Sequence, residues 1–154
     1  GAGKPERIWS GIKASFLLMG VYVVANFFIL WFGAKYMALM FVSASEVEII
    51  KDTELFLHVA ATFFPTLGLL CILRYSIQGV GYTTLAGFTN LAMFSGVAEM
   101  IARILVSVLA VPAFGYIAVC FGDPTAWMAA DLFLVPTFIV IYRRLKSRGV
   151  VMNN

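Results

Sequence analysis

The sequence predicts an all-α polytopic membrane helix bundle, with four transmembrane helices in one domain that covers residues 1–154. Hydrophobic residues make up 62% of the chain and charged residues 12%, against about 45–50% and about 25% in soluble domains. A soluble monomer of this composition would expose large apolar patches, which such proteins avoid. The apolar residues also gather in long runs between short polar segments, which is the pattern of membrane spans.

The first span is predicted at residues 14–34, which contain no charged side chain. At about 1.5 Å per helical residue, this run is long enough to cross a hydrocarbon core of about 30 Å. Gly33 is expected to end the helix. Residues 35–41 are then expected to form a short helix in the membrane interface, with Lys35 reaching water.

A polar and acidic segment at 43–54 precedes the second span, which is predicted at 55–73. His58 lies near the entry of this span and is read as an interfacial residue, with a proton shuttle as the alternative. Pro65 lies near its middle, where membrane helices tolerate proline. Arg74 marks its exit.

A turn is predicted after the second span, in the sequence Gln78-Gly79-Val80-Gly81. The third span is predicted at 83–111, closed by Pro112, and residues 113–122 are too few to cross, so they are read as a re-entrant or interfacial piece. The fourth span is predicted at 125–142. Asp123 is expected to cap its first turn, with Pro124 at a position where a missing N–H does no harm.

The distribution of cations predicts the orientation. The N-terminal segment, Arg74 and the C-terminal tail hold eight Lys and Arg, whereas the two opposite loops hold only Lys35 and Lys51. Cytoplasmic loops carry the excess of Lys and Arg. We therefore expect a multi-pass protein of the cell membrane with both termini in the cytoplasm.

Glu99 and Arg103 are the sharpest candidates for a functional site. They stand four residues apart, so they share one helix face near the middle of the third span. Such groups serve as proton or cation relays or as contacts for cationic substrates. The alternative, which we favour at this stage, is that Arg103 neutralises Glu99 in a structural ion pair.

Asp131 is the second candidate, inside the fourth span. The interpretation that we favour is a cavity-facing or interhelical hydrogen-bonding role, and the alternative is a functional polar contact. Close helix packing is expected at small residues in the last two spans, among them Ser95, Gly96, Ala126 and Ala130.

Several classes of function find no support in the sequence. The single histidine and the separated Cys71 and Cys120, read as buried free thiols, match no metal-ligand spacing. There is no nucleophile with a base and no phosphate-binding loop, and no basic stripe with interleaved aromatic residues. We expect no enzyme, no metal site, no cofactor and no nucleic-acid partner.

Four stretches taken together resemble the multidrug and toxic compound extrusion (MATE) family, in its bacterial multidrug branch. They are GAGKPERI at 1–8, LRYSIQGVGYT at 73–83, SGVAEMIARIL at 95–105 and GYIAVCFGDPTAWMAADLFL at 115–134. In this resemblance they correspond to the ninth to twelfth of twelve helices. The second stretch carries the turn residues Arg74, Gln78, Gly79 and Gly81, and the third carries Glu99 and Arg103.

The resemblance implies part of an antiporter that exports cationic, amphipathic compounds in exchange for Na⁺ or H⁺. The sequence starts at Gly1 without Met, and we expect a piece of a longer transporter that does not transport alone. Its expected partners are the lipid bilayer, the preceding helices and cationic small molecules. Some members place an acidic residue on the tenth helix, which the second span lacks, so the coupling ion is open.

Two other functions remain as alternatives. The first is a self-contained four-helix exporter that works as a dimer, like the small multidrug resistance proteins. Those proteins carry their essential Glu in the first span, whereas the first span here has no charge. The second is a membrane scaffold or assembly subunit that transports nothing.

Overall fold

The computed structural model describes residues 5–79, 84–85, 88–89 and 91–151, and these are mostly helical, as the fold class predicts. The helices are α1 (Pro5–Leu39), α2 (Val47–Gly79), α3 (Leu91–Leu105), α4 (Val111–Phe114), α5 (Tyr116–Cys120) and α6 (Gly122–Val151). A π-helical turn, η1 (Val106–Ala110), joins α3 to α4, and β1 (Thr84–Leu85) pairs antiparallel with β2 (Phe88–Thr89). Among the described residues, four helical stretches are long and apolar enough to cross a membrane: Arg7–Leu39, Val47–Gly79, Phe94–Phe114 and Gly122–Leu145.

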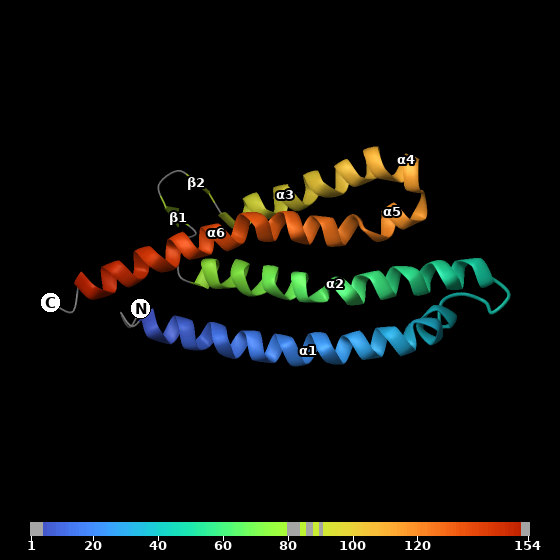
Figure 1. The fold of residues 1–154 in the computed structure, drawn as a ribbon, viewed down its shortest axis with the longest axis horizontal. Coiled ribbons are helices and arrows are strands. Elements are labelled where there is room, and N and C mark those ends of the chain that lie inside the picture. Colours follow the sequence, from blue (N-terminus) through green and yellow to red (C-terminus); the bar gives the residue numbers. More distant parts are fainter. Residues whose placement is uncertain (1–4, 80–83, 86–87, 90, 152–154) are drawn as a thin grey trace.

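The long helices form two antiparallel hairpins that lie side by side (Figure 1). One hairpin joins α1 to α2, and the other pairs α3 with α6. Contacts between α2 and α6 hold the hairpins together, so α1 and α3 flank a central pair. Both ends of the chain lie at the same end of the bundle (Figure 1), as an even number of spans requires.

The core lies between α2 and α6. Leu70, Leu73 and Ile77 of α2 pack in one buried cluster with Leu134 and other apolar residues of α6. Ala126 and Ala130 are fully buried, as expected for small residues at a close helix contact. The same expectation is wrong for Gly96, which is exposed and has nothing near the position of a Cβ atom.

A close approach between α1 and α2 occurs at Gly68. A Cβ atom added to this glycine would lie 2.7 Å from Cγ of Met19 on α1. A larger residue at this position would require the Met19 side chain to shift, and the flexible Met side chain fills the space that glycine leaves.

The first helix does not end at Gly33, and no separate interfacial helix follows it. Instead, α1 continues to Leu39, and Ala34 and Ala38 beyond the glycine are both buried. An internal glycine costs a helix only about 1 kcal/mol relative to alanine, which burial of the next turn offsets.

The third span departs from its predicted limits at both ends. The short β1–β2 pair lies where its first turns were expected, and α3 begins at Leu91. Pro112 does not close the helix, since α4 runs through it. The π turn η1 ends two residues before Pro112. Its wider backbone leaves room for the proline ring, which in a regular α-helix would clash with the carbonyl oxygen four residues earlier. Gly115 ends α4 with a φ of 62°, a conformation that favours glycine.

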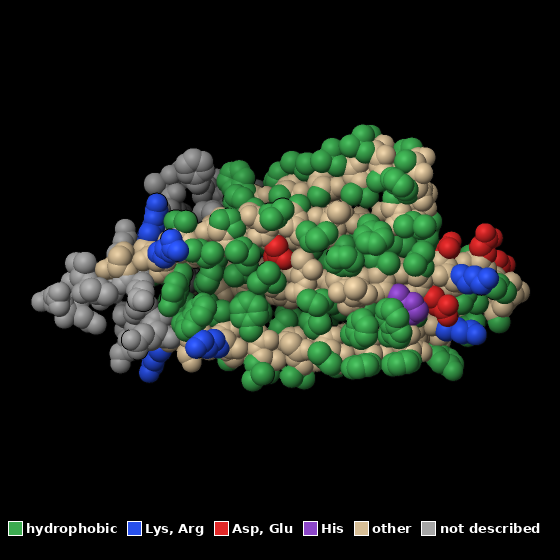
Figure 2. Space-filling view, viewed as in Figure 1, with side chains coloured by type: hydrophobic (Ala, Val, Ile, Leu, Met, Phe, Trp, Pro, Cys, Tyr) green, Lys and Arg blue, Asp and Glu red, His purple; other side chains and the backbone are tan. Residues whose placement is uncertain are grey.

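The flanking helices present apolar side chains outward (Figure 2). Leu17, Leu18 and Phe32 of α1 and Leu109 near the end of the third span are all strongly exposed. Cationic side chains lie toward the end that holds the termini, and both acidic and cationic ones lie at the opposite end (Figure 2). A chain that exposes this much apolar surface between two polar ends matches the layers of a bilayer.

Candidate functional site

A polar cluster lies inside the bundle, where α2, α3 and α6 meet. Arg74 of α2 donates hydrogen bonds from Nη2 to Oε1 of Glu99 on α3, and from Nε to Oγ of Ser95 at 3.1 Å. The side chains of Arg74 and Glu99 are 24% and 13% exposed, and Ser95 is fully buried. The cluster is therefore an interhelical ion pair, and the guanidinium also binds a buried hydroxyl.

The predicted pairing of Glu99 with Arg103 is wrong. Although both residues lie on α3, Glu99 bonds to Arg74 and Arg103 bonds to Asp123. An ion pair four residues apart on one helix is worth only about 0.3–0.5 kcal/mol. Such a small preference is overridden when a neighbouring helix brings a better-placed guanidinium.

The second acidic member of the cluster is Asp131 on α6, which is 7% exposed. Neither of its carboxylate oxygens has a hydrogen-bond partner among the described residues. The charges of Arg74 and Glu99 both act on this carboxyl group, so the three side chains share one electrostatic environment. The predicted hydrogen bond between helices is not formed here, and Asp131 is a buried polar group without a direct partner.

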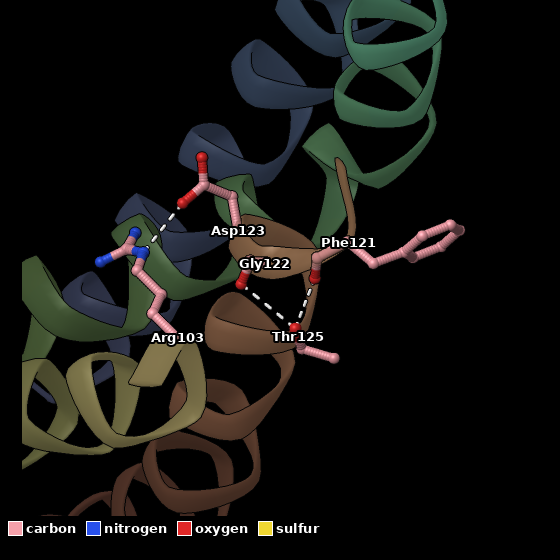
Figure 3. A network of polar contacts seen from close by, with 5 residues as sticks. All are labelled: Arg103, Phe121, Gly122, Asp123 and Thr125. Atoms are coloured by element: carbon pink, nitrogen blue, oxygen red, sulfur yellow. Dashed lines mark hydrogen bonds and ion pairs between the residues drawn. The ribbon is translucent and has the colours of Figure 1, made fainter. Parts of the chain in front are cut away.

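A second ion pair lies on the outside of the same helices (Figure 3). Arg103 donates from Nε to Oδ1 of Asp123 at 2.8 Å, and the two side chains are 45% and 41% exposed. Asp123 thus contacts α3, in addition to lying in the first turn of α6 as expected. Thr125 donates to the carbonyl oxygens of Phe121 and Gly122 (Figure 3), which tightens the junction of α5 and α6.

The predicted turn residues do not act as a unit. Arg74 lies inside the bundle rather than at the exit of the second span, because α2 continues to Gly79. Gln78 and Gly79 belong to the last turn of this helix. Gly81 lies outside the described residues, so its role stays a prediction.

His58 links the two helices of the first hairpin. Its Nε2 lies 3.0 Å from the carbonyl oxygen of Trp31, and the two rings lie 4.5 Å apart. The contact lies about one turn beyond Glu54, the last acidic residue of the polar segment, and far along α2 from Arg74. It is a packing contact of α1 on α2, and His58 does not join the cluster.

Both cysteines are free thiols. Cys120, outside the four spanning stretches, is buried, and this burial raises the pKa of its thiol. It therefore stays in the protonated, unreactive form. Cys71 is half-buried on α2, and the charges of Arg74, Glu99 and Asp131 act on it.

A groove between α1 and α2 leads toward the cluster. Its wall includes Ser15 and Tyr22 from α1, and Cys71, Tyr75 and Ser76 from α2. Apolar side chains, among them Leu18 and Met19, complete the lining, and Cys71 is the lining residue on which the charges of the cluster act.

Taken together, the four apolar helices and the polar groups between them define a multi-pass membrane protein with ionisable residues inside its bundle. The sequence profile of the MatE family matches residues 1–104, and the chain belongs to this family of transporters. The matched part includes Arg74, Ser95, Glu99 and Arg103, whereas Asp123 and Asp131 lie beyond it. No curated protein and no solved structure gives a significant match.

Proposed function

We propose that the chain is part of a secondary antiporter that exports cationic, amphipathic compounds in exchange for Na⁺ or H⁺. The observation that carries this proposal is the cluster of Arg74, Glu99 and Asp131 at the junction of three apolar helices of a MatE-family chain. Ionisable groups inside a membrane are costly, and they commonly mark ion and substrate pathways. Carboxylates are also the groups that attract cationic solutes.

The exposed ion pair supports the idea that further helices complete the transporter. Arg103 lies near the middle of the stretch Phe94–Phe114, yet it and Asp123 are almost half exposed. Charges at such a depth face protein or a water-filled cavity rather than lipid. We infer that this side of α3 and α6 borders the substrate cavity, whose remaining walls come from other helices.

We also propose a location in the cell membrane with both termini in the cytoplasm. Because Arg74 is engaged within the bundle, it no longer counts as a loop cation. Seven Lys and Arg still lie toward the termini, against Lys35 and Lys51 at the opposite end. Lys4→Cys and Arg148→Cys, each in a chain without Cys71 and Cys120, should resist an impermeant thiol reagent applied to intact cells. Labelling of either from outside contradicts this orientation.

Efflux of a fluorescent cationic dye from a pump-deficient bacterial host tests the proposed function. Expressed alone, the chain should leave efflux at background. Expressed with the preceding helices of a complete MatE-family transporter, it should give efflux that stops when the ion gradients are dissipated. Robust efflux by the chain alone would favour the small dimeric exporter instead. Background efflux in both experiments, with both chains present in the membrane, would favour the scaffold.

A further inference from the structure

The charges in the cluster do not balance if all three side chains are ionised. Arg74 contributes one positive charge, and Glu99 and Asp131 would contribute two negative charges. Arg74 already bonds to Glu99 and Ser95, whereas Asp131 has no hydrogen-bond partner among the described residues. An ionised carboxylate that is buried without a partner is strongly disfavoured, and such a group takes up a proton instead.

Among the described residues, the surroundings of Asp131 offer no second cation. The charged or titratable groups that act on it are Arg74 on α2 and Glu99 on α3, and Cys71 of α2 lies in the same field. The described part of α1 adds no charged group to this environment. Two carboxyl groups therefore compete for one guanidinium.

We propose that Arg74, Glu99 and Asp131 form a proton-binding site that couples transport to H⁺ rather than to Na⁺. In the described conformation Asp131 carries the proton and Glu99 is the carboxylate that pairs with Arg74. Breaking the O–H bond of Asp131 releases H⁺ to water and leaves a carboxylate, while Arg74 keeps its charge. The guanidinium has enough donors to serve either carboxylate, so Arg74 can pair with Asp131 after this proton has left. Glu99, which then lacks its cation, takes up a proton from water.

The position of Arg74 is the reason to exclude sodium. A sodium ion between the two carboxyl groups would lie beside a guanidinium that already neutralises one of them, and like charges repel strongly at low dielectric. A proton needs only one carboxyl oxygen.

The site also lies at a point where a change of charge can move helices. Its three residues come from α2, α3 and α6, and α2 and α6 are the elements that join the two hairpins. Moving the ion pair from Glu99 to Asp131 would replace a contact between α2 and α3 by one between α2 and α6. The coupling of this helix movement to transport rests on the proposed antiport. The protonation of Asp131 does not, because it depends only on the residues of this chain.

Infrared spectroscopy of the purified chain at neutral pH, in a maltoside detergent that has no carbonyl group, tests the proposal. Protonated carboxyl groups absorb in a region where carboxylates do not. The wild-type chain should show this band with the intensity of one group, and Asp131→Asn should remove it. Glu99→Gln should also remove it, because Arg74 would then pair with an ionised Asp131. Asp123→Asn is the matched control, since this exposed carboxylate is already paired, and the band should remain.

Replacing choline chloride by sodium chloride should leave the band unchanged. The proposal is overturned if the wild-type chain lacks the band, if Asp131→Asn retains it, or if sodium removes it. If the band is retained in a folded Glu99→Gln chain, the proposed exchange of partners between Glu99 and Asp131 is overturned. Circular dichroism and gel filtration check that each variant is folded, and the wild-type spectrum is decisive even if a variant is not. Because no transport is measured, this result is independent of the dye-efflux experiment.

Discussion

The two interhelical ion pairs of this bundle differ in their surroundings more than in their chemistry. Each joins an arginine to a carboxylate on another helix, and each involves α3. The Arg74–Glu99 pair is largely buried, and it has a buried serine and a buried aspartate as neighbours. The Arg103–Asp123 pair lies on the surface with nearly half of each side chain exposed. The comparison teaches that burial, rather than the presence of an ion pair, decides how much the bundle depends on it.

The largest effect is expected for Arg74→Met. This change leaves Glu99 without its cation and removes the positive charge nearest to Asp131. Breaking a buried ion pair by removing one partner costs about 3–5 kcal/mol. Reversible unfolding in mixed detergent micelles should show a loss of this size. A loss below that of Arg103→Met would contradict the distinction between the buried and the exposed pair.

A smaller loss is expected for Glu99→Gln, about 1–3 kcal/mol, because it removes a hydrogen bond to a charged group. Asp131 can replace Glu99 as the partner of Arg74, so the buried guanidinium keeps a counterion. The same unfolding measurement checks this order. If Glu99→Gln costs as much as Arg74→Met, Asp131 does not compensate.

The smallest loss is expected for Arg103→Gln, at most about 1 kcal/mol, as for exposed ion pairs in general. Because ions screen exposed charges, this loss should shrink further as salt is added. The loss in Arg74→Met should change little with salt. The unfolding free energies of both variants at low and high salt test this difference. A large, salt-independent loss for Arg103→Gln would contradict it, because the Arg103–Asp123 pair would then be shielded from solvent.

The sequence predicts the architecture well because the apolar runs carry that information. Long apolar runs with few charges allowed the four spans to be recognised, and the polar residues between them located the loops. Helix ends were predicted less well. Gly33 was read as a stop although the helix continues, and Pro112 was read as a stop although a π turn accommodates it. The first error arises because burial of the following turn overrides a local preference, and the second arises because a π turn accommodates the proline ring.

The two acidic residues of the cluster were named as candidates from the sequence, but its cation and its pairing were not predicted. Glu99 and Asp131 were recognised because ionisable residues are rare within apolar runs, whereas Arg74 was placed in a turn. A depth estimate would have helped: Arg74 precedes the end of α2 by five residues, and Glu99 follows the start of α3 by eight. At about 1.5 Å per residue, they lie within about one helical turn of the same depth. The spacing of Glu99 and Arg103 within one helix does not show which side chains of the neighbouring helices lie at the same depth.

The central claim is that Glu99 pairs with Arg74 across the helix interface and not with Arg103 on its own helix. Two double-mutant cycles, measured as unfolding free energies under one set of conditions, test it most directly. Glu99→Gln combined with Arg74→Met should show a coupling energy of about 2 kcal/mol, within the range of residues in contact. Glu99→Gln combined with Arg103→Met should be additive within about 0.5 kcal/mol. Strong coupling to Arg103 and additivity with Arg74 would contradict the account.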